Sequence, residues 1–404
     1  MKEKNTAAKG LLAVLIMILC AVLIFSNLKP SDQKQTEDSV TPQSPYSIRN
    51  MKGVWINYLE FGEMIRGKSL EQYRENVENC LKNVTSLGLD TVVLHVRSHC
   101  DAFYESNIFP YSYQLSGKQG EGCGFDPLDE FVRLAHEKNI RVEAWINPYR
   151  VTSGSDLLES LDPNNPARNF DAQKQELISL ETGSYLNPSC QKSSELIVSG
   201  VREILDKYPV DGIHFDDYFY PSSDESIDSL IYENYCGQTI EPKSLGDFRR
   251  EMVNLMIKSV YDEVKKHEGV AFGISPAADV EKNRNVLFAD VESWCKGGFC
   301  DYICPQIYFG FDYPTEGFDF LSVCKKWQEL CQTNVNLNIG IGAYKIGKTD
   351  ASSEEWKTYD DILKRQANYA KEIGAGVCFY NYSALFSNDG LNTAQRENLK
   401  NSCF

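Results

Sequence analysis

Short β-rich runs alternate with amphipathic helical patterns from residue 51 to the end of the chain. Eight such runs are rich in Val, Ile, Tyr and Phe, and they cover residues 54–58, 91–97, 142–147, 212–216, 270–275, 302–308, 337–343 and 377–382. Eight β/α units in sequence, without a second zone of different composition, predict a single closed (β/α)8 barrel of the TIM type.

Apolar residues recur at helical spacing between these runs. The pattern predicts helices over residues 73–87, 127–138, 245–267, 318–330 and 354–373. The longest connections, residues 150–194 and 221–244, follow the third and fourth predicted strands. Both connections should lie on the C-terminal face, where barrels of this kind place their active sites.

Alternation within the strands predicts which side chains enter the barrel. The outer face of a barrel strand packs on helices and must be apolar, so the polar set points inward. The inward set comprises His95, Arg97, Glu143, Trp145, Asn147, His214, Asp216, Gln306 and Tyr308. Burying so many polar groups costs too much desolvation for a purely structural network. We therefore expect a functional site at the C-terminal mouth.

Two adjacent carboxyl groups end the fourth predicted strand. Asp216 faces inward, and Asp217 begins the loop, where its side chain can turn toward the same cleft. Two carboxylates in a partly dry cleft cannot both ionise freely, so their pKa values should split. Glycosidic cleavage needs one proton donor and one anion. The alternative is that Asp217 only caps the next segment and Asp216 acts alone.

Two further charged residues have open roles. Glu143 lies about four residues below Asn147, roughly 13 Å beneath the rim. That depth favours a buried partner of Arg97 or His214 over a catalytic acid. Arg150 follows the third strand, and it could bind a lactyl carboxylate of the substrate or pair with an acidic neighbour.

The charge of the chain excludes one class of partner. The formal net charge is -16, and the first 31 residues carry four Lys and one Glu, so the remaining residues carry -19. Such an acidic body repels phosphate backbones, and we expect no nucleic-acid partner. Aromatic residues make up 12% of the chain and include 22 Tyr, which suits a cleft for sugars or other flat, weakly polar ligands.

The N-terminus predicts an extracytoplasmic protein. Lys2, Lys4 and Lys9 precede an unbroken apolar run over residues 11–25, a pattern typical of export signals. We interpret residues 1–28 as an uncleaved membrane anchor or a cleaved signal, with a lipoprotein at Cys20 as a third alternative. Residues 29–50 read as a flexible linker, and residues 51–404 form the barrel domain.

Cysteine usage favours no particular site. Twelve of the 13 Cys lie outside the apolar run, so export would permit disulfides, but no spacing fixes a pairing. Buried thiols would explain them equally well. Cys295, Cys300 and Cys304 lack the spacing of zinc or iron–sulfur sites, and we expect no cofactor.

Several motifs resemble one protein family in colinear order. The segments "GVWINY", "VVLHVRSHCDAFYES", "GFDPLDEFVRLAHEKNIRVEAWINPYR", "YLNPS", "DGIHFDDYFYP", "FGISP" and "YICPQIYFG" are similar to the glycosyl-hydrolase-like family 10, also called domain of unknown function 187. The resemblance implies an exported bacterial TIM-barrel glycoside hydrolase of cell-wall or other extracellular glycans. It implies Asp216 and Asp217 as the catalytic pair, with cleft residues Arg97, Asp101, Asn147, Tyr149, Arg150, His214, Gln306 and Tyr308. Ala277 and Ala278 replace an aromatic-containing loop of the family after Pro276.

Two mechanisms fit the Asp pair. In one, a carboxylate attacks the anomeric carbon and a second carboxyl protonates the leaving oxygen. In the other, which we favour, the N-acetyl group of the substrate is the nucleophile, Asp216 orients it and Asp217 is the acid and base. Tyr218, Tyr308 or Tyr380 would hold the acetamide. The expected substrate is a glycan that contains N-acetylhexosamine, such as peptidoglycan.

Two other classes of function remain open at this point. His95, His99, Asp101, His214 and Asp216 include the residue types of a metal-dependent polysaccharide deacetylase, although His95 lies in a strand and His99 in the following loop. A non-catalytic cell-wall glycan-binding protein is the second alternative.

Overall fold

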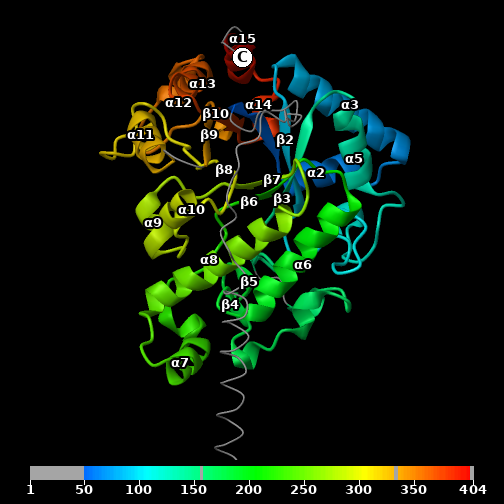
Figure 1. The fold of residues 1–404 in the computed structure, drawn as a ribbon. Coiled ribbons are helices and arrows are strands. Elements are labelled where there is room, and N and C mark those ends of the chain that lie inside the picture. Colours follow the sequence, from blue (N-terminus) through cyan, green and yellow to red (C-terminus); the bar gives the residue numbers. More distant parts are fainter. Residues whose placement is uncertain (1–49, 155–157, 332–334, 401–404) are drawn as a thin grey trace, which may run out of the picture. The chain divides into compact units, whose positions relative to one another are not determined.

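Eight parallel strands form a closed barrel in the computed structural model, which describes residues 50–154, 158–331 and 335–400 (Figure 1). The barrel order is β1-β10-β9-β8-β7-β6-β3-β2. Its strands are β1 (Lys52–Ile56), β2 (Thr91–Arg97), β3 (Arg141–Ile146), β6 (Gly212–Phe215), β7 (Ala271–Ile274), β8 (Tyr302–Ile303), β9 (Asn336–Ile341) and β10 (Gly376–Phe379).

The first and last strands close the barrel. Lys52 of β1 pairs with Val377 of β10, and Val54 pairs with Phe379. The predicted closed barrel is therefore confirmed, with each of the eight predicted runs contributing one strand.

A helix follows each barrel strand, as a (β/α)8 fold requires. The helices are α2 (Tyr58–Ile65), α3 (Leu70–Ser86), α4 (Tyr113–Ser116), α5 (Pro127–His136), α6 (Gln191–Lys207), α7 (Ser229–Gln238), α8 (Leu245–Val264), α9 (Val280–Asn285), α10 (Val291–Gly297), α11 (Phe320–Leu330), α12 (Glu355–Thr358), α13 (Ile362–Glu372), α14 (Tyr382–Leu385) and α15 (Gly390–Lys400). Short 3₁₀ turns add η2 (Leu158–Ser160), η3 (Pro166–Asn169), η4 (Ala172–Lys174), η5 (Glu225–Ile227) and η6 (Ala343–Lys345).

Local sequence signals begin several of these helices. Asp126 caps α5 by accepting hydrogen bonds from the backbone N–H groups of Leu128 and Asp129, and Pro127 occupies the first helical position. Ser69 and Gln72 form a capping box at α3. Such caps satisfy backbone donors that the first turn leaves unpaired.

Three predicted elements differ from the structure. The connection after β3 contains a hairpin, β4 (Leu177–Leu180) with β5 (Gly183–Leu186), that the sequence pattern did not predict. The predicted helix over 354–373 is broken between α12 and α13, where the free carbonyl oxygens of Tyr359 and Asp360 accept hydrogen bonds from Gln395 and Asn398 of α15. The sixth run pairs continuously only over β8, since Pro305 has no N–H to donate.

The barrel interior differs in composition from the layer between strands and helices. The outer layer is a continuous apolar core that includes Val77, Leu81, Val142 and Ile213. The interior cluster combines Trp55, Trp145 and Tyr302 with smaller residues. This inner set follows the predicted alternation, in which polar and aromatic side chains point into the barrel.

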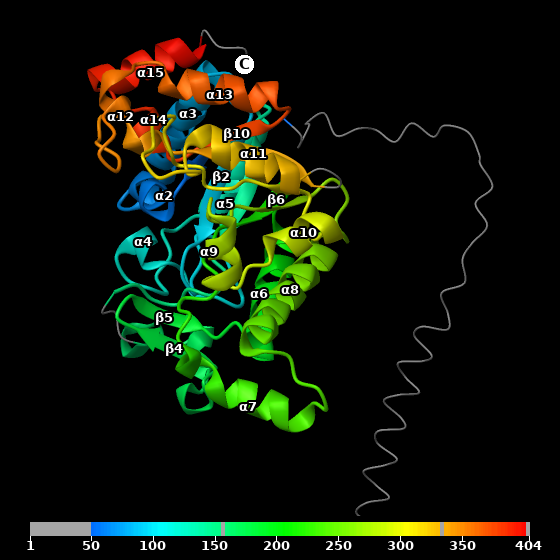
Figure 2. The ribbon, with the colours of Figure 1, turned by 90° about the vertical axis from the view of Figure 1, so that its left-hand side faces the viewer.

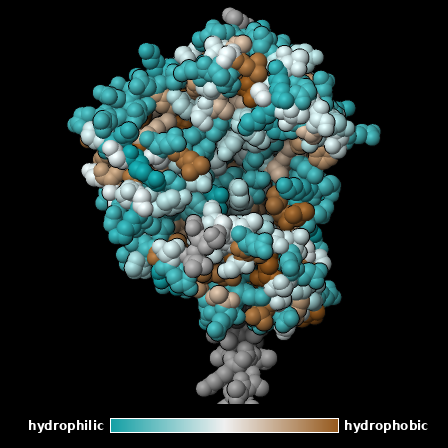
Figure 3. Space-filling model, turned by 180° about the vertical axis from the view of Figure 1, so that it is seen from behind, coloured by the Kyte–Doolittle hydropathy of each residue, from teal (hydrophilic) through white to brown (hydrophobic). Residues whose placement is uncertain are grey.

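The loops and inserted elements that come directly after the C-terminal ends of the strands lie on one side of the barrel. In Figure 2 this side is on the left, where α2, α4, β4 and β5 are found. Figure 3 faces the same side and shows a largely hydrophilic surface with separate hydrophobic patches. The candidate site lies at this mouth.

The predicted N-terminal anchor lies outside the described residues. Within the described ranges, no helix is long and apolar enough to cross a membrane. The eleven cysteines in those ranges are free thiols, and seven of them, such as Cys80, are buried in the apolar interior.

Candidate active site

Asp216 and Asp217 lie at the C-terminal end of β6. Asp216 is 4% exposed, and its carboxyl group accepts hydrogen bonds from Trp145 Nε1 at 3.0 Å and from the Tyr218 backbone N–H at 3.2 Å. Asp217 is more exposed and accepts a hydrogen bond from Gln306 Nε2 at 3.0 Å. The two carboxyl groups are therefore fixed by different partners from β3 and from the segment after β8.

The electrostatic environment favours protonation of this pair. Burial raises the pKa of Asp216 to about 7, and the charge of Asp217 adds to the rise, while Arg150 opposes it. Burial also raises the pKa of Asp217, and the hydrogen bond from Gln306 opposes that rise. The Asp217 charge contributes to the Asp216 shift, so Asp217 ionises first and the last proton stays on Asp216. This splitting is what an acid and an anion in one cleft require.

Two indole rings and two imidazoles form the floor beneath the pair. His95 stacks on Trp145, with ring centroids 3.6 Å apart. Trp55 Nε1 donates to His214 Nε2 at 3.3 Å, so His214 carries its proton on Nδ1 and donates it to the Tyr302 hydroxyl at 2.7 Å. Burial lowers the pKa of His214 to about 3. The floor is thus uncharged and rigid.

Tyrosine rings form one wall of the cleft. Tyr380 packs edge-on against Trp145 and Trp55, with centroids 6.5 and 6.0 Å away. Tyr308 stacks on Tyr380 at 5.7 Å, and Tyr344 packs edge-on against both. Burial raises the pKa of Tyr380, and the charge of Asp216 contributes, so this hydroxyl stays protonated near the carboxyl pair. A wall of this kind offers apolar ring faces and hydroxyl donors together.

Arg150 lies between two further tyrosine rings of the cleft. Its guanidinium is 5.6 Å from the Tyr58 ring centroid and 5.0 Å from that of Tyr218, and Nε donates to the Ser98 carbonyl at 2.8 Å. Arg150 forms no salt bridge with a described acidic residue, although its charge lowers the pKa values of Asp216 and Asp101. Its charge remains available to a ligand.

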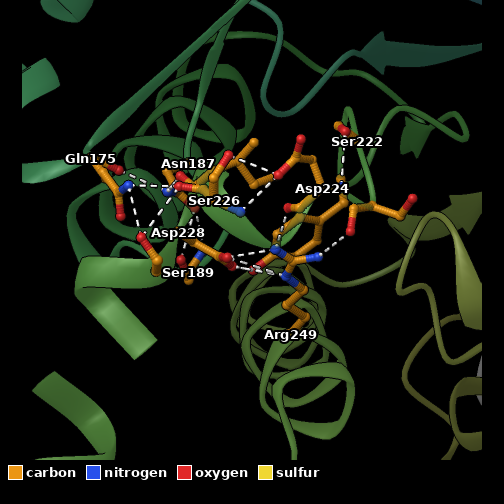
Figure 4. A network of polar contacts seen from close by, with 12 residues as sticks. Gln175, Asn187, Ser189, Ser222, Asp224, Ser226, Asp228 and Arg249 are labelled. Atoms are coloured by element: carbon orange, nitrogen blue, oxygen red, sulfur yellow. Dashed lines mark hydrogen bonds and ion pairs between the residues drawn. The ribbon is translucent and has the colours of Figure 1, made fainter. Parts of the chain in front are cut away.

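A buried ion pair holds the loop that begins at Asp217 (Figure 4). Arg249 of α8 donates to both carboxylate oxygens of Asp228, with Nη2–Oδ1 at 2.6 Å and Nε–Oδ2 at 3.0 Å. The same guanidinium donates to the carbonyl oxygens of Ser223 and Asp224. Tyr220 donates its hydroxyl to Asp228 at 3.1 Å. The segment after the Asp pair is therefore fixed at four points.

Comparison with known proteins identifies the family. Residues 50–358 match the family Glycosyl hydrolase-like 10. The chain belongs to this family. It is 32% identical over 323 residues to the glycosyl hydrolase YngK of Bacillus subtilis, which covers 74% of this chain and 62% of YngK. It is also 32% identical over 343 residues to the glycosyl hydrolase DigH of Escherichia coli, over 78% of this chain and 76% of DigH. The match to YngK thus spans less than two thirds of that relative.

Solved structures agree with the fold of the glycosyl hydrolase-like 10 family member described above. The glycoside hydrolase domain of PgaB from Bordetella bronchiseptica superposes with a TM-score of 0.58 at 12% identity, covering 88% of this chain and all of that domain. At this identity the likeness shows the barrel fold alone.

Two residues that the family resemblance placed in the cleft lie elsewhere. The pairing of β2 with β3 shifts between His95 and Arg97, and this β-bulge turns Arg97 outward. Its guanidinium packs over the Phe109 ring at 4.5 Å and against Gly200 of α6, so the predicted inward orientation of Arg97 is wrong. Tyr149 is 0% exposed within the apolar core and does not reach the cleft.

Glu143 has a different partner from those predicted. Its carboxylate accepts a hydrogen bond from Arg141 Nη2 at 2.8 Å, where Arg97 or His214 was expected. Burial raises the pKa of Glu143 to about 7, and Arg141 opposes the rise. Glu143 is 0% exposed, which agrees with the buried role that its depth predicted.

The residues proposed for metal binding have other partners. His99 is hydrogen-bonded through both ring nitrogens, to Ser98 at 2.9 Å and Ser153 at 2.7 Å, and His95 is stacked on Trp145. Within residues 50–154, 158–331 and 335–400, no group of three His, Cys, Asp or Glu side chains could hold a metal ion. The geometry therefore offers no support for the metal-dependent deacetylase.

The structure adds cleft residues that sequence patterns did not single out. Tyr58 follows β1 and Tyr344 follows β9, and Asn147 lies deep beside His95 as alternation predicted. Tyr58 lies two residues after β1 and Tyr344 three residues after β9, and this closeness to strand ends could have drawn attention to them. Without the barrel, nothing in their local sequence distinguishes them from other surface tyrosines.

Proposed function

We propose that this protein is an exported glycoside hydrolase that cleaves O-glycosidic bonds in a cell-wall glycan containing N-acetylhexosamine. One observation carries the proposal: two adjacent carboxyl groups with raised pKa values lie at the mouth of a family-matched barrel, beside a wall of tyrosine rings. One carboxyl group can keep a proton while its neighbour is ionised, which glycosidic cleavage requires. The relatives YngK and DigH carry the name glycosyl hydrolase.

The proposed mechanism is substrate-assisted. Asp216, held by Trp145 and the Tyr218 backbone, orients the acetamide of the substrate, and Asp217 protonates the leaving oxygen. In the empty cleft the last proton lies on Asp216. An acetamide N–H that donates to Asp216 stabilises its anion and lowers its pKa. Substrate binding would therefore move the proton from Asp216 to Asp217. Tyr218 and Tyr380 are the hydroxyls that would hold the acetamide, because both lie within the field of Asp216.

Peptidoglycan fits the cleft in one further respect. Arg150 lies between Tyr58 and Tyr218 and forms no salt bridge with a described acidic residue. A guanidinium binds carboxylates through parallel N–H donors. A lactyl carboxylate on the sugar ring is therefore a suitable ligand for Arg150.

The experiment is cleavage of purified peptidoglycan, with and without its stem peptides, by the full-length chain, with products identified by mass spectrometry. Asp216→Asn and Asp217→Asn keep size and remove the charge or the transferable proton. Each should lower kcat about 10²–10⁴-fold, the usual contribution of general acid–base catalysis. An Asp262→Asn variant, whose side chain is 57% exposed on α8, is the matched control.

Two outcomes would overturn the proposal. If both Asn variants retain normal turnover, the Asp pair is not catalytic. If the parent protein binds the glycan without any cleavage, the non-catalytic binding protein is the better description. A thiazoline mimic of the cyclised intermediate that fails to inhibit would reject substrate assistance in favour of a carboxylate nucleophile.

A further inference from the structure

A second pocket lies on the C-terminal side of the barrel, between the connections that follow β2 and β3. Its volume is about 540 Å³, which lies in the range of small-molecule sites. Polar and apolar side chains share its lining, which includes His99, Asp101, Tyr113, Gln119, Val151 and Leu161. The proposed reaction at Asp216 and Asp217 does not use this pocket.

Hydrogen bonds hold the floor of the pocket in place. Gln119 Nε2 donates to Asp101 Oδ2 at 3.3 Å, and Gln119 Oε1 accepts from the Asp162 backbone N–H at 2.8 Å. Asn165 Nδ2 donates to the Cys100 carbonyl at 2.7 Å. The segment that carries Asp101 is thus anchored from two directions, and the pocket is preformed.

Asp101 retains unused hydrogen-bonding capacity at this wall. The residue is 0% exposed, and its Oδ1 atom accepts no hydrogen bond of ordinary geometry from the described residues, although the Ser112 hydroxyl and the Tyr113 backbone N–H lie near enough to lower the pKa of the carboxyl group. Burial raises the pKa of Asp101 to about 6, and Gln119 and Ser112 partly offset the rise. Near neutral pH the group is mainly a carboxylate, so a suitable ligand must donate hydrogen bonds.

Contiguous side chains join the pocket to the Asp pair. The His99 ring packs edge-on against Tyr58, with centroids 5.4 Å apart. Arg150 lies over Tyr58 and also over Tyr218, whose backbone N–H donates to Asp216. A chain-like ligand that lies along these residues would therefore touch both sites.

We propose that this pocket is a distal sugar subsite, which binds a sugar unit of the same glycan away from the bond held by Asp216 and Asp217. The proposal rests on the proposed glycan substrate. Sugar hydroxyl groups donate to Asp101, and the Tyr113 ring, 37% exposed at the rim, packs against the apolar face of the sugar. The enzyme should consequently favour extended chains over short oligosaccharides.

Length dependence tests the subsite. N-acetylglucosamine oligosaccharides are supplied to the full-length chain, and kcat/KM is measured for the shortest that the parent cleaves and for a long soluble one. Asp101→Asn should lower kcat/KM for the long substrate about 10- to 100-fold, the range expected for a lost hydrogen bond to a charged group. The short substrate should be unaffected. The ratio of kcat/KM for the long substrate to kcat/KM for the short one should therefore fall. Tyr113→Ala, a change at the exposed rim, should lower this ratio too.

The controls separate the subsite from the proposed function. Asp262→Asn should leave the ratio unchanged, and Tyr113→Ala decides the matter if Asp101→Asn does not fold. A ratio that neither variant changes overturns the subsite. If the parent cleaves no oligosaccharide of this kind, the peptidoglycan assay alone decides the hydrolase proposal. Calorimetric binding of the long oligosaccharide to the parent and to both variants then decides the subsite, which is rejected if all three bind alike or none binds.

Discussion

At the scale of single residues, the behaviour of Asp216 follows from where its carboxyl group is buried. It accepts hydrogen bonds from Trp145 and from the Tyr218 backbone, yet burial and the Asp217 charge outweigh them and raise its pKa to about 7. The hydrogen bonds favour the ionised form of Asp216, whereas burial and the neighbouring charge favour its protonated form. The balance between them affects both activity and stability.

The pH dependence of catalysis should report this pair. A carboxyl group whose pKa is raised keeps its proton until the pH passes that raised value. We expect kcat/KM of the parent to fall as pH rises through about 7, when the last proton leaves the pair, and to fall again in acid, when Asp217 is protonated. Measuring kcat/KM from roughly pH 4 to 9 reports these free-enzyme ionisations. A flat profile above pH 6 would contradict the assignment.

The free energy of unfolding should decrease as pH rises, whereas a salt-bridged carboxylate would make it increase. The pKa of Asp216 is about 7 in the folded protein and about 3.9 when unfolded. The folded state binds the proton more tightly, so the parent loses stability as pH rises from about 4 to about 7. Relative to the parent, Asp216→Asn should therefore gain on the order of 2–4 kcal/mol over this interval. Urea unfolding at both ends of the interval measures the gain, and Asp262→Asn should show none.

At the scale of elements, the connection between β6 and α8 depends on one buried ion pair. Arg249 is 1% exposed and Asp228 is 0% exposed, and their contacts fix the backbone from Tyr220 to Asp228 (Figure 4). This segment follows Asp217 and Tyr218 directly. Its conformation therefore positions the cleft residues without touching a substrate.

Removing one partner of this pair should destabilise the protein strongly. Asp228→Asn leaves the Arg249 charge buried without its carboxylate, which typically costs about 3–5 kcal/mol. The exposed pair of Lys258 and Asp262 should contribute no more than about 1 kcal/mol, so Asp262→Asn serves again as the control. Urea unfolding compares the two variants. We also expect kcat of Asp228→Asn to fall under conditions where the variant is fully folded, and an unchanged kcat would reject the positioning role.

At the scale of the whole molecule, the location of the barrel decides which glycans it meets. The basic start and the apolar run over residues 11–25 lead us to propose an outward-facing barrel tethered or released at the membrane. Protease added to intact cells should digest residues 51–404. Digestion only after lysis would reject the outward orientation, and a cytoplasmic protein detected in the same samples controls for cell integrity.

The sequence by itself determined the barrel, because its eight strands and their helices are encoded by local periodicity. It also determined that the Asp216 side chain points into the barrel, since alternation is a property of consecutive residues. The same local logic failed at Arg97, where a β-bulge between β2 and β3 reverses the side chain. A bulge depends on the pairing of two strands and leaves no mark in either one alone.

The tertiary structure alone decided how the cleft is built. Gln306 and Asp217 are 89 positions apart, and Trp145 and Asp216 are 71 apart, so no local pattern predicts their hydrogen bonds. The hairpin of β4 and β5, the partner of Glu143 and the pairing of Arg249 with Asp228 likewise depend on contacts between distant segments. Periodicity specifies which face of an element is buried, whereas the chemistry of a site depends on which buried faces meet.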